Sequence, residues 1–169
     1  QVPVDELGDF FLPLNDLGIH ENYYFADRWA YEGNVYALTF GVSADGIVYN
    51  KESFKKAGIE TVPTKLSEMK AAYEKLKASG AYPMILNLAD GWPLTAWEGL
   101  ATSISGDPNF MNATLADDTP IAADKPWGKS LAILKDVIDS GLAEDDLSTG
   151  HWQDSKGWLA SGKGASWFL

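Results

Sequence analysis

Runs of apolar residues separated by short polar breaks divide the chain into strand-like and helix-like segments. The run Val35–Phe40 has the length of a strand, and Ile47–Tyr49 forms a second one after a glycine-containing break. A helical pattern follows at residues 52–57, with Asn50 ahead of it and Gly58 placed to end it in the left-handed conformation. This order predicts a crossover unit in which the polar break lies at a ligand-binding edge.

The same alternation continues downstream. Helices are predicted for residues 67–79, 93–104 and 127–138, because their apolar positions recur at steps of three and four. Strands are predicted for residues 81–88 and 164–169. A strand, helix, strand connection is right-handed and makes its strands parallel, so residues 81–88 are expected to run parallel to the strand before them. The prediction is an α/β fold with three layers, α/β/α, around a mostly parallel central sheet.

Two further segments carry weaker patterns. Five aromatic residues crowd Glu21–Tyr31, which is predicted as a helix whose rings either pack in a core or stack on a sugar. Ile121 and Ala122 interrupt a polar, turn-rich stretch and predict a short strand. No repeat, low-complexity tract or linker divides the sequence, so the chain is expected to form one compact unit.

The acidic composition excludes some classes of function. The chain has 169 residues, of which 46% are hydrophobic and 22% charged, an ordinary globular mixture. Its formal net charge of -11 argues against a nucleic-acid partner, because phosphate binding needs a basic face. Without cysteine, disulfides and thiolate chemistry are excluded, and no apolar run reaches the roughly eighteen residues of a membrane span. Gln1 and the apolar run 164–169 read like the interior of a sequence, so a fragment of a larger protein is expected.

One long stretch resembles a known family. The residues GVSADGIVYNKESFKKAGIETVPTKLSEMKAAYEKLKASGAYPM are similar to a segment of extracellular solute-binding proteins of the maltose-binding type, the sugar receptors of ABC importers. In that family a strand ending in Tyr-Asn-Lys precedes a short helix, an Ala-Gly-Ile turn and a proline-containing loop. The later stretches NLADGWPLTAWEGL, WGKSLAILKDVIDSGL and LASGKGASWFL fall where the family keeps a binding loop, a long helix and a small-residue strand. The resemblance covers nearly the whole chain.

This resemblance implies a fold and a function. Residues 1–169 are expected to be a single α/β lobe, mainly the second lobe of a two-lobed receptor with a periplasmic-binding-protein-like fold. Residues about 1–40 and 160–169 are expected near the crossing between the lobes. The parent receptor would capture a mono- or oligosaccharide between its lobes without catalysis and dock on a membrane permease. It would act as a monomer outside the cytoplasm, in the periplasm or as a cell-surface lipoprotein. A free-standing carbohydrate-binding or protein-interaction module is the alternative.

Asp90, Gly91 and Trp92 follow directly after the predicted strand 81–88. Open α/β sheets bind ligands at the carboxyl ends of their strands. A carboxylate accepts two hydroxyl hydrogens and an indole covers the apolar face of a pyranose, so this loop is a candidate sugar site. The resemblance implies the same, because the family's loop contributes ligand contacts there. The alternative is that Asp90 caps the following helix and Trp92 fills the core.

The break between the first two predicted strands gives a second candidate. Ser43, Ala44 and Asp45 are small or polar residues at this break, which the family uses at its cleft and hinge. Asp45 either accepts a sugar hydroxyl or pairs with a basic side chain. Maltose-type relatives have a glutamate near this hinge where this chain has Ser43, which weakens the transfer of that ligand role and allows a different sugar.

Catalytic, metal and cofactor sites find little support in the sequence. Asp90 and Glu98 are eight residues apart, about two helical turns, which fits poorly with the paired carboxylates of a glycosidase. His151 and Asp154 form a lone pair without metal-ligand spacing. The stretch GWLASGKG, residues 157–164, has glycine where a phosphate-binding loop needs Ser or Thr. No cofactor, metal ion or catalytic residue is predicted.

Overall fold

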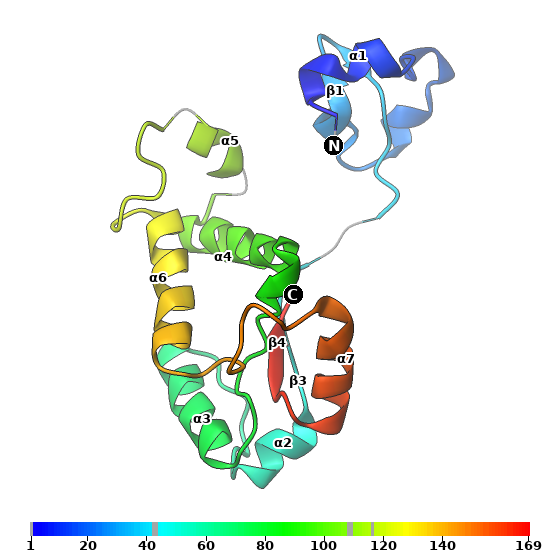
Figure 1. The fold of residues 1–169 in the computed structure, drawn as a ribbon. Coiled ribbons are helices and arrows are strands. Elements are labelled where there is room, and N and C mark those ends of the chain that lie inside the picture. The colour runs from blue at the N-terminus through cyan, green and yellow to red at the C-terminus, as the bar shows by residue number, and fades with distance from the viewer. Residues whose placement is uncertain (1, 42–43, 108–109, 116) are drawn as a thin grey trace. The chain divides into compact units, whose positions relative to one another are not determined.

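The computed structural model describes residues 2–41, 44–107, 110–115 and 117–169. They form two compact units, residues 1–44 and 45–169 (Figure 1). The division falls at the polar break between the first two predicted strands, whereas the sequence predicts one compact unit. The assignment of the chain to the second lobe of a larger receptor stays a prediction.

Short turns make up most of the first unit. Its elements are the 3₁₀ turns η1 (Val4–Glu6), η2 (Asn15–Leu17), η3 (Ile19–Asn22) and η4 (Ala26–Trp29), the short helix α1 (Leu7–Phe10), and the strands β1 (Ala30–Tyr31) and β2 (Asn34–Val35). The two strands pair antiparallel as a hairpin. Its turn has positive φ at Glu32 (49°) and Gly33 (81°), the conformation that matches the natural twist of the strands. Asn15 fixes the hairpin, because its side chain accepts from Val35 N at 2.9 Å and donates to Gly33 O at 3.1 Å.

Two predictions for this unit are wrong. The helix predicted for Glu21–Tyr31 is broken, because Phe25 adopts φ 60° between η3 and η4. The aromatic rings also lack a common buried face, since Tyr24 is 87% exposed, and a short helix without such a face has little to stabilise it. The strand predicted for Val35–Phe40 ends at Val35, where the pairing of the hairpin ends.

The second unit contains the longer helices of the chain (Figure 1). Its elements are β3 (Ile47–Tyr49), α2 (Lys51–Lys56), α3 (Leu66–Ala78), η5 (Leu88–Asp90), η6 (Trp92–Thr95), α4 (Ala96–Ser105), α5 (Phe110–Leu115), α6 (Pro126–Asp139), α7 (Trp152–Ser161) and β4 (Ser166–Phe168). The helices predicted for residues 67–79, 93–104 and 127–138 are confirmed as α3, η6 with α4, and α6. The short strand predicted at Ile121 is wrong: the residue lies in a turn, 66% exposed.

Strand β4 has neighbours on both sides. It pairs antiparallel with β3, with Ile47 opposite Phe168 and Val48 opposite Trp167. Isolated parallel bridges join Tyr82 and Ile85 to the segment around β4. The segment 81–88 therefore lies beside β4 and not beside β3, its predecessor in the sequence. The α/β class is confirmed, whereas the mostly parallel character of the sheet is not confirmed.

The backbone donors of residues 81–88 explain why this segment is not a regular strand. Pro83 has no N–H group, and Met84 N donates to Leu142 O at 2.9 Å. The N–H groups of Leu86 and Asn87 donate to the carboxylate of Glu144. The loop between α6 and α7 thus takes the place that a second pairing strand would occupy.

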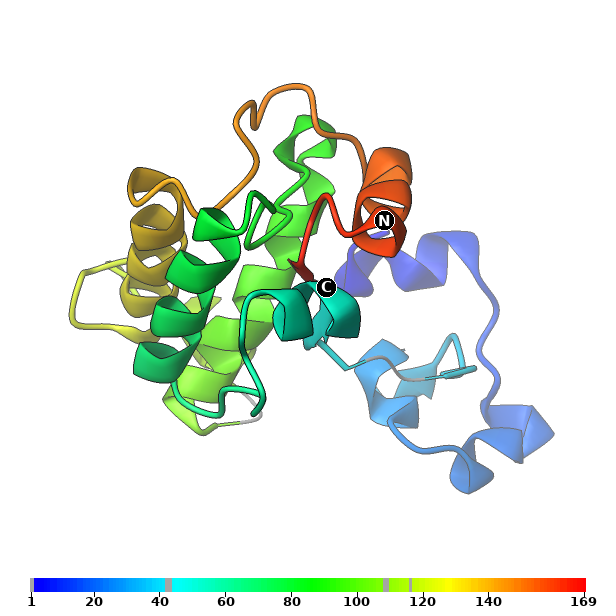
Figure 2. The ribbon, with the colours of Figure 1, turned by 90° about the horizontal axis from the view of Figure 1, so that it is seen from below.

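Apolar side chains from α3, α4 and α6 meet in the core of the second unit. Figure 2 shows α3 next to α6, and the salt bridge Lys70–Asp136, at 2.7 Å, joins them. Leu76 is fully buried in α3. Tyr73 bonds Ser166 Oγ at 2.9 Å, and burial raises the pKa of its hydroxyl to about 12. Every helix among the described residues is too short or too polar to cross a bilayer.

The predicted start of α2 at Asn50 is confirmed. The Asn50 side chain accepts from Ser53 N at 2.9 Å, which caps the helix, and donates to Leu159 O at 2.8 Å, which links α2 to α7. Gly58 follows α2 with φ 69°, as the sequence predicts.

Candidate functional site

Asp90 holds the start of a helix that lies far away in the sequence. It ends η5, and its Oδ2 accepts from Trp152 N at 2.6 Å, at the first turn of α7. Its Oδ1 lies 2.9 Å from Nδ1 of His151. The expected alternative, a cap on the following helix, is wrong, because α4 has no side-chain cap and Asp90 caps α7 instead. The loop 90–92 is thereby attached to α7.

The pair formed by Asp90 and His151 has complementary pKa shifts. The N–H of Trp152, and then the bond from His151, lower the pKa of the Asp90 carboxyl. The same carboxylate raises the pKa of the His151 imidazole, first through the hydrogen bond and then through its charge. Both shifts favour the ion pair, although solvent screens it because the His151 side chain is 59% exposed.

Trp92 lies at the surface on top of two further tryptophans. It is 50% exposed, so the alternative that it fills the core is wrong. Its ring centroid lies 4.5 Å from that of Trp152, which lies 4.3 Å from that of Trp167. Trp167 is 4% exposed, and its Nε1 donates to Asn87 Oδ1 at 2.8 Å. We call Trp92, Trp152 and Trp167 the tryptophan stack; it runs from an exposed ring down to a buried one.

Gly91 makes the turn between the acid and the indole. Its φ of 72° and ψ of −48° are unfavourable for residues with a side chain. This turn lets Asp90 bond α7 while Trp92 begins η6. The sequence prediction that these three neighbours form one exposed loop is in keeping with the geometry, and their role toward a ligand stays a proposal.

The second group of candidates is separate from this loop. Asp45 is exposed and its carboxylate lies against α4 at Gly99, where an added Cβ would clash with Oδ2. Next to it, Gly46 N donates to Leu169 O at 2.8 Å and Leu169 N donates back at 3.1 Å. Ala44 is exposed and belongs to the first unit. Ser43 lies outside the described residues. Among the contacts of the described residues, none joins Asp45 to Asp90 or Trp92.

Sequence reasoning missed His151 and Trp152 as site residues. It treated His151 as a lone pair with Asp154, whereas the structure places its Nδ1 on Asp90, 61 positions away. The available signal is local: His151 and Trp152 begin a helix, and a helix start needs acceptors for its free N–H groups. Nothing in the spacing identifies Asp90 as that acceptor. Among the described residues, no group of three or more His, Asp or Glu side chains could hold a metal ion.

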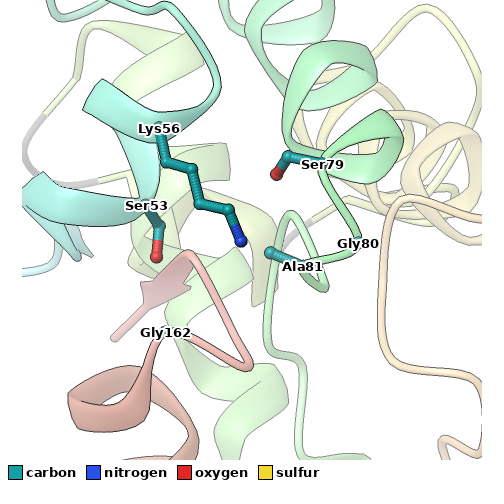
Figure 3. Close-up of a pocket in the computed structure, with 6 residues that line it drawn as sticks. All are labelled: Ser53, Lys56, Ser79, Gly80, Ala81 and Gly162. Carbon is teal, nitrogen blue, oxygen red and sulfur yellow. The ribbon is translucent and has the colours of Figure 1, made fainter.

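Two hollows elsewhere on the second unit suit a sugar less well. Figure 3 shows a small polar pocket in which Lys56 extends between Ser53 and Ser79; it holds about 60 Å³. Ligand pockets are typically about 300–1,000 Å³, so this one has room for water only. A larger groove of about 950 Å³ lies between α3, α4 and α6. Apolar residues such as Met69 and Leu100 form most of its wall, which offers few partners to hydroxyl groups.

Comparisons with known proteins identify the family. Residues 4–169 match the model described as "Bacterial extracellular solute-binding protein". The chain is 31% identical over 140 residues to the multiple sugar-binding protein of Streptococcus mutans, a match covering 80% of this chain and 33% of that protein. It is 33% identical over 91 residues to the alpha-glucosides-binding periplasmic protein of Rhizobium meliloti, covering 46% of this chain and 20% of that protein.

A solved structure of a solute-binding protein is similar to this chain over nearly its whole length. A manno-oligosaccharide-specific solute-binding protein of Bifidobacterium animalis subsp. lactis, in complex with mannotriose, is 32% identical and matches with a TM-score of 0.82. The match covers 99% of this chain and 42% of that one, so the chain spans less than half the length of this relative. The family model matches almost every residue, and the chain therefore belongs to the bacterial extracellular solute-binding proteins.

Proposed function

We propose that the chain is part of the carbohydrate-binding component of an ABC-type importer. The loop 90–92 forms, with His151, one wall of its sugar site. The observation that carries the proposal is the half-exposed indole of Trp92, supported from below by Trp152 and attached through Asp90 to α7. The relatives support the ligand class, because their names describe the binding of multiple sugars, α-glucosides and manno-oligosaccharides.

The geometry assigns a task to each group. The free face of Trp92 covers the apolar face of a pyranose, and its support by Trp152 fixes the ring before the sugar arrives. A carboxylate has about four lone-pair positions, and Asp90 uses two of them on α7, so others remain for sugar hydroxyls. His151 binds Asp90 through Nδ1, which leaves Nε2 of this exposed ring for a further hydroxyl.

The same contacts fit capture of a sugar and argue against Asp90 as the general acid of a glycosidase. A glycosidase needs a general acid whose pKa is raised, whereas the N–H of Trp152 and the imidazole of His151 lower the pKa of Asp90. Asp90 therefore stays ionised and serves as an acceptor. Ser43, Ala44 and Asp45 remain proposed ligand contacts.

The proposal extends to the whole receptor. It is a monomer outside the cytoplasm, in the periplasm or anchored as a lipoprotein, and this chain supplies mainly its second lobe. Closure of the two lobes around the sugar completes the site, and the closed form docks on a membrane permease. No metal, cofactor or nucleic acid takes part.

Calorimetric titration of the full-length receptor with mannotriose and a panel of α-glucosides tests this function. At least one saccharide should bind, and Trp92→Ala should weaken its binding about two- to tenfold, since an aromatic contact contributes about 0.5–1.5 kcal/mol beyond the area it buries. Trp127→Ala, which removes a partly buried tryptophan at the start of α6, is the matched control. Binding that is equal in the two variants would exclude Trp92 from the site. Binding by the isolated 169-residue chain as tight as by the receptor would favour a free-standing module.

A further inference from the structure

Glu144 is a buried acid at the inner end of the candidate site. It lies in the loop between α6 and α7 and is 5% exposed. Its Oε2 accepts from Leu86 N at 2.8 Å and its Oε1 from Asn87 N at 2.6 Å. A carboxylate is costly to bury unless its oxygens find such donors, so the two backbone N–H groups explain how the charge is tolerated.

Asn87 converts this backbone contact into the placement of a tryptophan. It is fully buried and adopts the left-handed conformation, with φ 43° and ψ 49°, directly before η5. Residues other than glycine rarely adopt this conformation, and the bond from its N–H to Glu144 holds it there. Its Oδ1 accepts from Trp167 Nε1 at 2.8 Å, so the same residue fixes the buried end of the tryptophan stack.

Three sets of contacts connect Glu144 to the exposed site residues. Through Asn87 and Trp167 the carboxylate reaches the tryptophan stack, where ring separations are 4.3 and 4.5 Å. Through the backbone of Asn87 it sets the start of η5, which ends at Asp90, three residues after Asn87. Gly150 makes the third contact: an added Cβ would lie 3.1 Å from Glu144 Oε1, so this glycine packs closely against the carboxylate just ahead of His151.

We propose that Glu144 is a positioning residue for the carbohydrate site, an inference that rests on the proposed function. It touches no ligand, because it is buried. Its two oxygens lock the turn at Leu86 and Asn87, and this turn orients both the tryptophan stack and the loop 90–92. The rigid placement of Trp92 before binding, on which affinity depends, therefore originates at an acid inside the loop that precedes α7.

The variant Glu144→Gln tests the lock with almost no change of volume. The amide keeps one acceptor oxygen but turns an N–H₂ group toward the other backbone N–H, so one of the two bonds is lost. Near-ultraviolet circular dichroism reports the mutual orientation of stacked indoles. We expect Glu144→Gln to reduce this signal clearly while the far-ultraviolet spectrum keeps its helical shape. Glu74→Gln, the same change at an exposed position of α3, should leave both spectra unchanged.

A second variant keeps the test decisive if Glu144→Gln unfolds. Asn87→Gly suits the left-handed backbone, keeps the N–H that bonds Glu144 and removes the side chain that accepts from Trp167, so it should fold and still lose the tryptophan signal. An unchanged near-ultraviolet spectrum in Asn87→Gly, or in a folded Glu144→Gln, would overturn the inference.

Sugar binding by the full-length receptor separates this inference from the proposed function. If the wild-type receptor binds its saccharide, Glu144→Gln should weaken binding by up to about tenfold, because the displaced loop must regain its wild-type arrangement before the sugar binds. Equal affinity of Glu144→Gln and wild type would refute the positioning role and leave the function intact. A wild-type receptor that binds no saccharide would refute the function, and the role of Glu144 for the ligand with it.

Discussion

Replacement of the middle ring of the tryptophan stack should destabilise the fold by an amount that the structure allows us to work out. Trp152 contacts Trp92 at 4.5 Å and Trp167 at 4.3 Å between ring centroids, in tilted arrangements. Each such pair contributes about 0.5–1.5 kcal/mol beyond the area it buries, so the two together contribute about 1–3 kcal/mol. The substitution Trp152→Leu keeps an apolar side chain and removes both ring contacts.

We therefore expect Trp152→Leu to lower the free energy of unfolding by about 2 kcal/mol, which corresponds to a decrease in Tm of roughly 4–8 °C for a chain of this size. Urea unfolding followed by far-ultraviolet circular dichroism measures the change. The start of α7 should persist, because Asp90 bonds the backbone N–H of residue 152 and not its side chain. Trp127→Leu, outside the stack, is the control. A loss below about 0.5 kcal/mol for Trp152→Leu, the range of ordinary surface substitutions, would show that the stack contributes no stability.

The remaining predictions concern pH and stability. Folding lowers the pKa of Asp90 from 3.8 and raises that of His151 from 6.5, so their contribution to the free energy of unfolding is complete between these two pH values. It should decline as pH falls through the lowered pKa of Asp90 and as pH rises through the raised pKa of His151. Urea titrations across pH should show both slopes in wild type and shallower ones in Asp90→Asn, and identical profiles would contradict the pairing. Asn50→Ala should lower the free energy of unfolding by about 1–2 kcal/mol, because it removes the cap of α2 and the bond to Leu159 O. An unchanged free energy in urea unfolding would show that these two bonds contribute no stability. Leu76→Ala, at a fully buried position of α3, should cost about 2–5 kcal/mol in the same assay, and a loss below 1 kcal/mol would place the core elsewhere.

Local patterns in the sequence predict much of the second unit. Leu76 belongs to an apolar stripe with three- and four-residue spacing, and this stripe identifies α3. Asn50 and Gly58 mark the two ends of α2, because capping depends on residues next to each other in the sequence. The loop 90–92 follows from the position of a glycine between polar and aromatic neighbours at the end of an apolar run.

The partners of these residues depend on contacts between distant segments, which a pattern does not encode. Asp90 is a good acceptor for any helix start, and only the folded chain brings it to Trp152 and not to the helix that follows it. In the same way, Glu144 reads as part of an acidic turn, yet it replaces a strand partner for Leu86. The aromatic segment Glu21–Tyr31 fails for a different reason, because its helical spacing predicts a common buried face whereas Tyr23, Tyr24 and Phe25 are exposed.

A crystal structure of the full-length receptor with its bound saccharide tests the central claim most directly. The account predicts a pyranose ring lying against the free face of Trp92, with hydroxyl groups bonded to Asp90 or His151. A saccharide bound elsewhere, for example in the groove between α3, α4 and α6, with Trp92 untouched, would contradict it.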